Sequence, residues 1–185
     1  PPGSGKSQVL LEAAIRAAKK GMQVIIVSPT GQLAHAYQAQ LPDVDGIENI
    51  RIDTMHGVLG YKRAGADSKV HWAPPSALRR IDLVLVDEAS QYDDVIWRRF
   101  FVAMNEQPHL PYTVATSVFQ QLQPVGGGGV CHEFCKRMPT VELCTVYRSK
   151  DTSHLLFLTR ICTAQPTRQV LQEYFGERHW ARREL

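Results

Sequence analysis

Hydrophobic and polar positions follow two alternating patterns along the chain. Residues 8–21 read QVLLEAAIRAAKKG, where apolar side chains recur at helical spacing and two lysines precede Gly21. This spacing predicts an amphipathic helix that ends at a glycine cap. The next segment, MQVIIVS at residues 22–28, is a nearly unbroken apolar run. Such a run is typical of a strand buried on both faces of a parallel sheet.

The alternation continues after residue 28. The pattern predicts a helix from about Gln32 to Ala39, a short strand at residues 49–53, a strong strand at residues 81–87, a helix around Val95 to Met104, and a strand at residues 112–116. Strands that alternate with helices in this way predict an α/β fold, a parallel sheet flanked by helices.

Three segments break this rhythm. Residues 60–76 lack periodicity and contain glycine, proline and basic residues, which predicts an exposed insertion. The GGGG run at residues 126–129 indicates a flexible joint. From Thr152 onward the pattern is mainly helical.

Composition limits the function classes. With 185 residues and 44% hydrophobic residues, the chain can fill the core of one domain. A formal net charge of +3 is too small to establish a nucleic-acid partner by bulk attraction. No stretch approaches the roughly 20 apolar residues that span a bilayer, so we expect a soluble protein with no membrane partner.

The cysteines give an expectation about the compartment. All four lie in the last third of the chain and follow no secretory signal: Cys131, Cys135, Cys144 and Cys162. Reduced thiols and an intracellular location are therefore expected, with nucleus, mitochondrion and cytoplasm left open. The segment CHEFC at residues 131–135 could suggest a metal site, but the short-spaced zinc pairs are missing.

The chain opens with PPGSGKS, which has the pattern of a phosphate-binding loop. In such a loop, Gly3, Ser4 and Gly5 offer backbone N–H groups to phosphates at the start of a helix. Lys6 would neutralise β- and γ-phosphate oxygens, and Ser7 would ligate Mg²⁺. The alternative is a glycine-rich turn that happens to contain lysine. The helix and strand that follow favour phosphate binding.

The segment LVLVDEAS supplies the acidic partner of such a loop. Asp87 follows a buried strand, and a carboxylate in that place can hold Mg²⁺ beside the phosphates. Glu88 could orient the attacking water as a general base. Taken alone, adjacent acids at a helix start are more often capping or solvated groups.

Further segments carry a family resemblance. Six segments occur in the order and rough spacing of motifs I, Ia, Ic, II, III and IV of superfamily 1 DNA helicases. In chain order they are PPGSGKS, VSPTGQLA, DTMHGVLG, LVLVDEAS, FQQLQPV and VYRSKD. They most resemble the PIF family and its relatives similar to the exonuclease V alpha subunit, up to about Asp151. The resemblance implies a P-loop NTPase with a RecA-like fold that is incomplete at both ends.

The resemblance also implies a domain organisation. Residues 1–150 match the first RecA-like motor domain, and residues 151–185 would be a helical extension toward a second RecA-like domain that is missing from this chain. That second domain normally forms the other wall of the ATP cleft.

Two loops match the stretches that contact single-stranded DNA in this family. The first contains Pro29, Thr30 and Gly31, and the second contains Thr54 and His56. Backbone N–H and hydroxyl groups there can meet phosphates. Taken alone, His56 would be an ordinary surface or packed imidazole.

The resemblance assigns two more residues to the nucleotide. Gln121 matches the glutamine that senses the γ-phosphate, and Arg148 matches the arginine that stabilises charge on the transferring phosphoryl group. Without the resemblance, Gln121 is a loop residue and Arg148 a surface arginine paired with Asp151.

Motif III departs from the family pattern. Gly-Asp usually precedes FQQLQPV, whereas this chain has Ser117 and Val118. Because valine neither holds water nor supports a magnesium shell, we expect impaired turnover or impaired coupling to DNA movement.

The leading interpretation is a fragment of an ATP-dependent DNA helicase, which couples ATP hydrolysis to translocation on single-stranded DNA and to unwinding. Its cofactors would be ATP and Mg²⁺. The alternative is a non-catalytic module that binds nucleotide or nucleic acid, and a small-molecule kinase is disfavoured by the ordered motifs. Unwinding polarity, preference for DNA over RNA and oligomeric state stay open.

Overall fold

A computed structural model describes residues 3–62, 71–72, 78–118, 124–147, 151, 156–157, 167, 169 and 172. The chain divides into two compact units. The larger unit is Gly5–Leu143, and the smaller unit combines Pro1–Ser4 with Cys144–Leu185.

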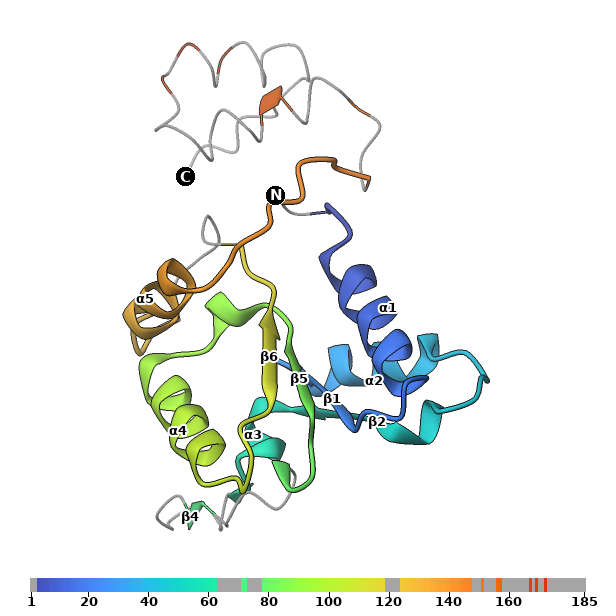
Figure 1. The fold of residues 1–185 in the computed structure, drawn as a ribbon. Coiled ribbons are helices and arrows are strands. Elements are labelled where there is room, and N and C mark those ends of the chain that lie inside the picture. Colours follow the sequence, from blue (N-terminus) through green and yellow to red (C-terminus); the bar gives the residue numbers. More distant parts are fainter. Residues whose placement is uncertain are drawn as a thin grey trace. The chain divides into compact units, whose positions relative to one another are not determined.

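The larger unit is built around a parallel sheet, which confirms the predicted α/β fold (Figure 1). The strand order is β2-β1-β5-β6, and every neighbouring pair is parallel. The strands are β1 (Val24–Ser28), β2 (Ile50–Thr54), β5 (Leu83–Val86) and β6 (Tyr112–Ala115).

Helices cover both faces of this sheet (Figure 1). On one face lie α1 (Lys6–Ala18) and α2 (Gly31–Gln40), and on the other lie α3 (Met55–Val58), α4 (Asp94–Asn105) and α5 (Gly129–Arg137). The described residues also form 3-10 turns η1 (Ile47–Asn49) and η3 (Ala89–Gln91) and a two-stranded antiparallel ladder of β3 (Tyr61–Lys62) with β4 (His71–Trp72).

The apolar run of β1 is buried on both sides, as the sequence predicts. Val24 and Ile26 pack with α1 and Tyr37 of α2. Ile25 and Val27 pack in the core that α4 covers. Because side chains alternate across a strand, one continuous apolar segment serves two separate cores.

Aromatic side chains fill the core under α4. Trp97 is fully buried, and its ring packs edge-to-face on Phe100 at 5.6 Å and stacks on Phe101 at 5.5 Å between centroids. Its indole Nε1 donates to the carbonyl oxygen of Ala89 at 3.1 Å. The polar tip of this large side chain is therefore satisfied inside the core.

The glycine run at residues 126–129 differs from the expected flexible joint. Gly129 begins α5, and the backbone N–H of Val130 donates to Asp94 Oδ1 at 2.9 Å. The N–H of Asp94 in turn donates to the carbonyl of Gly127 at 3.1 Å. An added Cβ at Gly126 would lie 2.8 Å from the Cβ of Asp93. The glycines thus allow a close, hydrogen-bonded approach to the start of α4.

Other expectations fall partly outside the described residues. The expected insertion spans residues 60–76, and its described part includes the β3–β4 ladder. Residues 63–70 and 73–76 of this insertion lie outside the described residues. In the smaller unit, the described residues Leu156, Phe157, Gln169 and Gln172 are helical. Among the described residues, no helix is both long and apolar enough to cross a membrane.

Candidate functional site

Several predicted site residues lie at the carboxyl edge of the sheet. Ser28 at the end of β1 pairs with Thr54 at the end of β2, and Val86 at the end of β5 pairs with Ala115 at the end of β6. Asp87 comes directly after Val86. Ligands of open α/β sheets bind outside the carboxyl ends of the strands, so this edge is the candidate site.

The amino end of α1 carries the predicted phosphate-binding residues. Gly3 has a φ of 75° and Gly5, the residue before the helix, has a φ of 83°. Glycine adopts this left-handed region without the steric cost that other residues meet. Lys6 is the first helical residue and is partly exposed, and Ser7 follows it. The positive end of the helix dipole lies here.

The Asp87 carboxylate is the centre of a hydrogen-bond network. It is 1% exposed. Its Oδ2 accepts from Ser7 Oγ at 3.1 Å and from the Tyr37 hydroxyl at 2.6 Å. Its Oδ1 accepts from Thr116 Oγ1 at 2.6 Å and from the N–H of Glu88 at 3.0 Å. The structure therefore brings together Ser7 and Asp87, the two residues predicted to hold Mg²⁺.

Four donors make a buried carboxylate tolerable, since an unpaired charge there would be very costly. Burial, and then the hydrogen bond to Asp87, raises the pKa of Tyr37 well above its ordinary value. Burial, followed by the charge of Asp87, likewise raises the pKa of Tyr92. Both phenols stay neutral, so Tyr37 remains a hydrogen-bond donor throughout the physiological pH range.

Glu88 has an unusual backbone conformation beside this network. Its φ of 48° and ψ of 49° place it in the left-handed region. Its N–H also lies 3.3 Å from Thr116 Oγ1. Its side chain makes no capping bond to the η3 turn that follows, which argues against the capping alternative. A non-glycine residue held in this region is a form of strain that often occurs at functional sites.

The two predicted DNA-contacting threonines are helix caps on neighbouring strands. Thr30 Oγ1 accepts from the N–H of Leu33 at 3.3 Å at the start of α2. Thr54 Oγ1 accepts from the N–H of Gly57 at 3.1 Å at the start of α3. Each hydroxyl uses one lone pair in its cap, and its own proton can still be donated outward.

The other three predicted DNA-contacting residues lie beside these two threonines. Pro29 is half-buried, and Gly31 is the exposed first residue of α2. His56 is exposed on α3, with its ring edge-to-face against Tyr61 at 5.1 Å between centroids. An imidazole and a phenol thus form an aromatic pair beside the Thr54 loop.

Two predicted nucleotide-sensing residues, Gln121 and Arg148, lie outside the described residues. The motif III departure is described. Val118 is buried at 3% exposure, and its carbonyl accepts from Ser90 Oγ at 3.2 Å. Ser117 Oγ is buried and hydrogen-bonds to none of the residues that the structure describes. The side chain of Val118 thus belongs to the packed interior.

Sequence reasoning missed two residues of the Asp87 network. Tyr37 is the buried tyrosine of α2, and no local pattern links it to a residue 50 positions away. Thr116 could have been found from the sequence. It comes directly after β6, just as Asp87 comes directly after β5, and β6 is the parallel neighbour of β5. A polar residue in that place faces the same edge of the sheet.

The donor set suits a hard cation. Among the described residues, no group of three or more His, Cys, Asp or Glu side chains could form an all-protein metal site. The hydroxyl of Ser7 and the carboxylate of Asp87 are oxygen ligands. Mg²⁺ usually takes one or two protein oxygens and completes its shell with water and phosphate oxygens, so these residues fit it.

Two cysteines on α5, Cys131 and Cys135, are free thiols. Cys131 is buried on α5, and Cys135 is half-buried one turn later. A hydrogen bond from Cys131 lowers the pKa of Cys135 to about 7.

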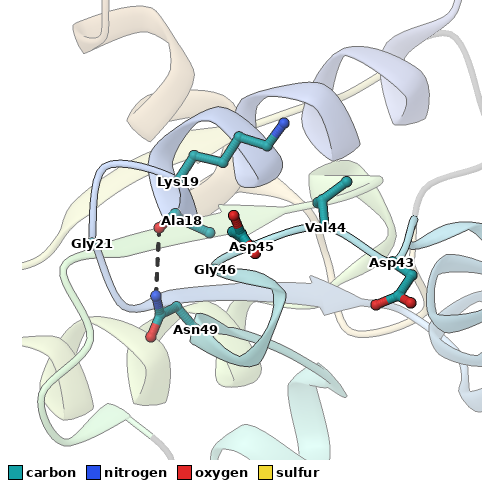
Figure 2. Close-up of a pocket in the computed structure, with 8 residues that line it drawn as sticks. All are labelled: Ala18, Lys19, Gly21, Asp43, Val44, Asp45, Gly46 and Asn49. Carbon is teal, nitrogen blue, oxygen red and sulfur yellow. Dashed lines mark hydrogen bonds between the residues drawn. The ribbon is translucent and has the colours of Figure 1, made fainter.

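A hollow lies at the opposite edge of the sheet, where β1 and β2 begin (Figure 2). Here Asn49 Nδ2 donates to the carbonyl of Ala18 at 3.4 Å, and Gln23 Nε2 donates to Asn49 Oδ1 at 2.7 Å. An added Cβ at Gly46 would lie 2.8 Å from the Ala18 oxygen. These contacts fix the loop before β2 to the end of α1, away from the carboxyl edge.

Comparisons with known proteins agree with the fold. A family model described as an AAA domain matches residues 1–177. The chain is 30% identical over 147 residues to an ATP-dependent RecD2 DNA helicase of Deinococcus radiodurans, covering 80% of this chain and 18% of that protein.

Two solved structures of Pif1 from Bacteroides are similar. Pif1 bound to single-stranded DNA has a TM-score of 0.61 and 18% identity, covering 92% of this chain and 43% of that chain. Pif1 in complex with ADP-AlF4 has a TM-score of 0.56 and 19% identity, covering 92% and 42%. This chain spans less than half the length of each of these proteins.

Proposed function

Since the chain belongs to the AAA-domain family, we propose that it is the first RecA-like domain of a PIF-like superfamily 1 helicase and that it binds ATP with Mg²⁺. The protein that contains it couples ATP hydrolysis to translocation on single-stranded DNA and to duplex unwinding. The similar protein of Deinococcus radiodurans is an ATP-dependent DNA helicase, and a similar Pif1 structure contains ADP-AlF4.

The contact between Ser7 and Asp87 is the observation that carries this proposal. The two residues are 80 positions apart, yet the Ser7 hydroxyl donates to the Asp87 carboxylate at the carboxyl edge. A serine after a phosphate-loop lysine and an aspartate after a buried strand are the pair that holds Mg²⁺ in P-loop NTPases.

Each residue has a defined task in this proposal. Lys6 binds phosphate oxygens, and Ser7 and Asp87 hold the metal ion, which when bound would neutralise charge on the phosphates. Glu88 orients the attacking water and accepts its proton. Gln121 and Arg148 remain predictions for contacts to the γ-phosphate.

The strand of DNA would lie along the loops after β1 and β2. Thr30 and Thr54 each expose a hydroxyl and a helix start there. These groups suit phosphates of the backbone, whereas His56 beside Tyr61 offers a ring for stacking against a base. Backbone contacts of this kind weaken as the salt concentration rises.

We assign residues 1–150 to the first motor domain and residues 151–185 to an extension toward a second RecA-like domain. The motif order supports this division. In the intact protein, that second domain would close the ATP cleft.

Steady-state ATP hydrolysis by the full-length protein, with and without single-stranded DNA, tests the proposal. We expect DNA to stimulate turnover, and we expect Lys6→Ala to lower kcat by about 100-fold because phosphate charge is no longer neutralised. Lys19→Ala is the matched control, since Lys19 is exposed just beyond the carboxyl end of α1. Equal turnover in the wild type and Lys6→Ala would refute the assignment.

The same assay decides between a motor and a non-catalytic module. Val118 stands where the family pattern has an aspartate, and its buried side chain supplies no metal-shell oxygen. A protein that binds both nucleotide and DNA but shows no turnover at any DNA concentration would establish the module instead.

A further inference from the structure

We propose that Tyr37 and Thr116 are positioning residues that fix the Asp87 carboxylate for metal binding. This inference rests on the proposed function, because it concerns the same Mg²⁺ site. It adds two residues that lie outside the sequence motifs discussed for phosphate and metal binding.

The two hydroxyls hold the carboxylate from opposite ends. Tyr37 donates to Oδ2 and Thr116 donates to Oδ1, each at 2.6 Å. Distances this short are typical of charge-assisted O–H···O⁻ bonds, which are the stronger class of hydrogen bonds. With one such bond on each oxygen, the carboxylate plane has little freedom to rotate.

The bond from Ser7 differs from these two. Ser7 Oγ shares Oδ2 with Tyr37, but its distance to that oxygen is longer, at 3.1 Å. Ser7 is also exposed, whereas Tyr37 is 3% exposed. The Ser7 bond is therefore the one that a cation can replace, while the bonds from Tyr37 and Thr116 keep Asp87 in place.

The positioning groups come from independent elements. Tyr37 projects from α2, Thr116 follows β6, and Asp87 follows β5. The N–H of Thr116 donates to the carbonyl of Val86 at 2.9 Å, which fixes its backbone beside Asp87. This arrangement is an outer shell of the kind that orients metal ligands and tunes their affinity.

A merely structural role would have a different signature. If the hydroxyls serve only to satisfy a buried charge, their removal lowers the stability of the fold but leaves metal affinity per folded molecule unchanged. Tyr92 provides a matched control, because it is also a buried tyrosine near the charge of Asp87. Its hydroxyl hydrogen-bonds to no residue in the described part of the chain.

The experiment measures Mn²⁺ binding, as a substitute for Mg²⁺, by electron paramagnetic resonance of the full-length protein with saturating ADP. We expect Tyr37→Phe and Thr116→Val each to weaken Mn²⁺ binding by about tenfold, in line with other outer-shell substitutions. Tyr92→Phe should match the wild type, and Thr116→Ser should restore the affinity. ADP affinity without metal should be the same in all variants.

Each outcome is decisive. The positioning role would be overturned if folded Tyr37→Phe and Thr116→Val bind Mn²⁺ as tightly as Tyr92→Phe does. In that case, Mn²⁺ binding by the wild type would still support the proposed function. A wild-type protein that binds ADP without taking up Mn²⁺ would refute the metal site itself, and with it both proposals. Thermal unfolding of each variant, followed by circular dichroism, verifies that the folded states are being compared.

Discussion

At the scale of single residues, the neighbourhood of a group decides its chemistry more than its type does. Asp87 and Asp45 are both aspartates, but Asp87 is buried and accepts from four donors, whereas Asp45 is exposed on the loop before β2. Only the first geometry holds a carboxylate in one orientation, which is what a preorganised metal ligand requires.

Cys135 gives a prediction at this scale. Its pKa is lowered to about 7 by the hydrogen bond from Cys131, so about half of the thiol is ionised at pH 7. We expect alkylation by iodoacetamide to rise with pH to a midpoint near 7. Cys131→Ala should return the pKa toward its ordinary value and slow alkylation at pH 7 roughly fivefold, since lost thiolate is partly offset by higher nucleophilicity.

Peptide-resolved mass spectrometry separates Cys135 from the other thiols. Cys131→Ser is the control, because a serine hydroxyl can still donate to the Cys135 sulfur. An unchanged alkylation midpoint in Cys131→Ala would show that the neighbouring thiol does not set the reactivity of Cys135.

At the scale of elements, the amino end of α4 makes two sets of hydrogen bonds. The residue before the helix caps it, and the first residue of the helix bonds to the start of α5. Asp93 Oδ1 accepts from the N–H of Ile96 at 2.8 Å. Asp94 accepts from Val130 at the start of α5. The first turn of α4 therefore stabilises two helices, and the close glycine run makes that approach possible.

Asp93→Ala should destabilise the fold by about 1 kcal/mol, because the N–H of Ile96 at the start of α4 loses the side-chain oxygen that accepts its hydrogen bond. For a chain of this size the melting temperature should fall by roughly 2–4 °C. Calorimetric unfolding measures the change. Asp93→Asn keeps an oxygen at the same position and should stay close to the wild type. Identical melting of Asp93→Ala and the wild type would disprove the capping contribution.

The elements that sequence reasoning predicts are those with a strong local pattern. The helix after the phosphate loop and the strands β1 and β5 follow directly from apolar spacing. The glycine run was wrongly predicted as a flexible joint, because its order depends on Asp94, which lies 36 positions from Val130. Contacts over that range leave no periodic signal in the sequence.

At the scale of the whole molecule, the larger unit has two distinct sheet edges. The carboxyl edge carries Asp87 with Ser7, and the capped loops of Thr30 and Thr54. The amino edge carries the hollow at the end of α1, where contacts between loop and helix are structural. Parallel strands make this asymmetry possible, since all of their carboxyl ends meet at one edge.

The sequence singles out some residues of this edge and not others. Ser7 and Asp87 are predicted metal ligands because each lies in a short motif beside a recognisable helix or strand, and the structure brings the two into contact. Tyr37 was not predicted, because only the packing of α2 on the sheet brings its hydroxyl to Asp87. Short motifs thus single out candidate ligand residues, whereas a contact such as that of Tyr37 with Asp87 becomes visible only in the fold.

The most direct test of the central claim is calorimetric titration of ADP, with Mg²⁺ and with a chelator, into the wild-type protein and Ser7→Ala. Ser7 is exposed, so the substitution should leave the fold intact. We predict that Mg²⁺ tightens ADP binding to the wild type. In Ser7→Ala, the factor by which Mg²⁺ tightens ADP binding should be about tenfold smaller, while the affinity for ADP without metal is unchanged. An equal Mg²⁺ gain in both proteins would contradict a metal site shared by Ser7 and Asp87.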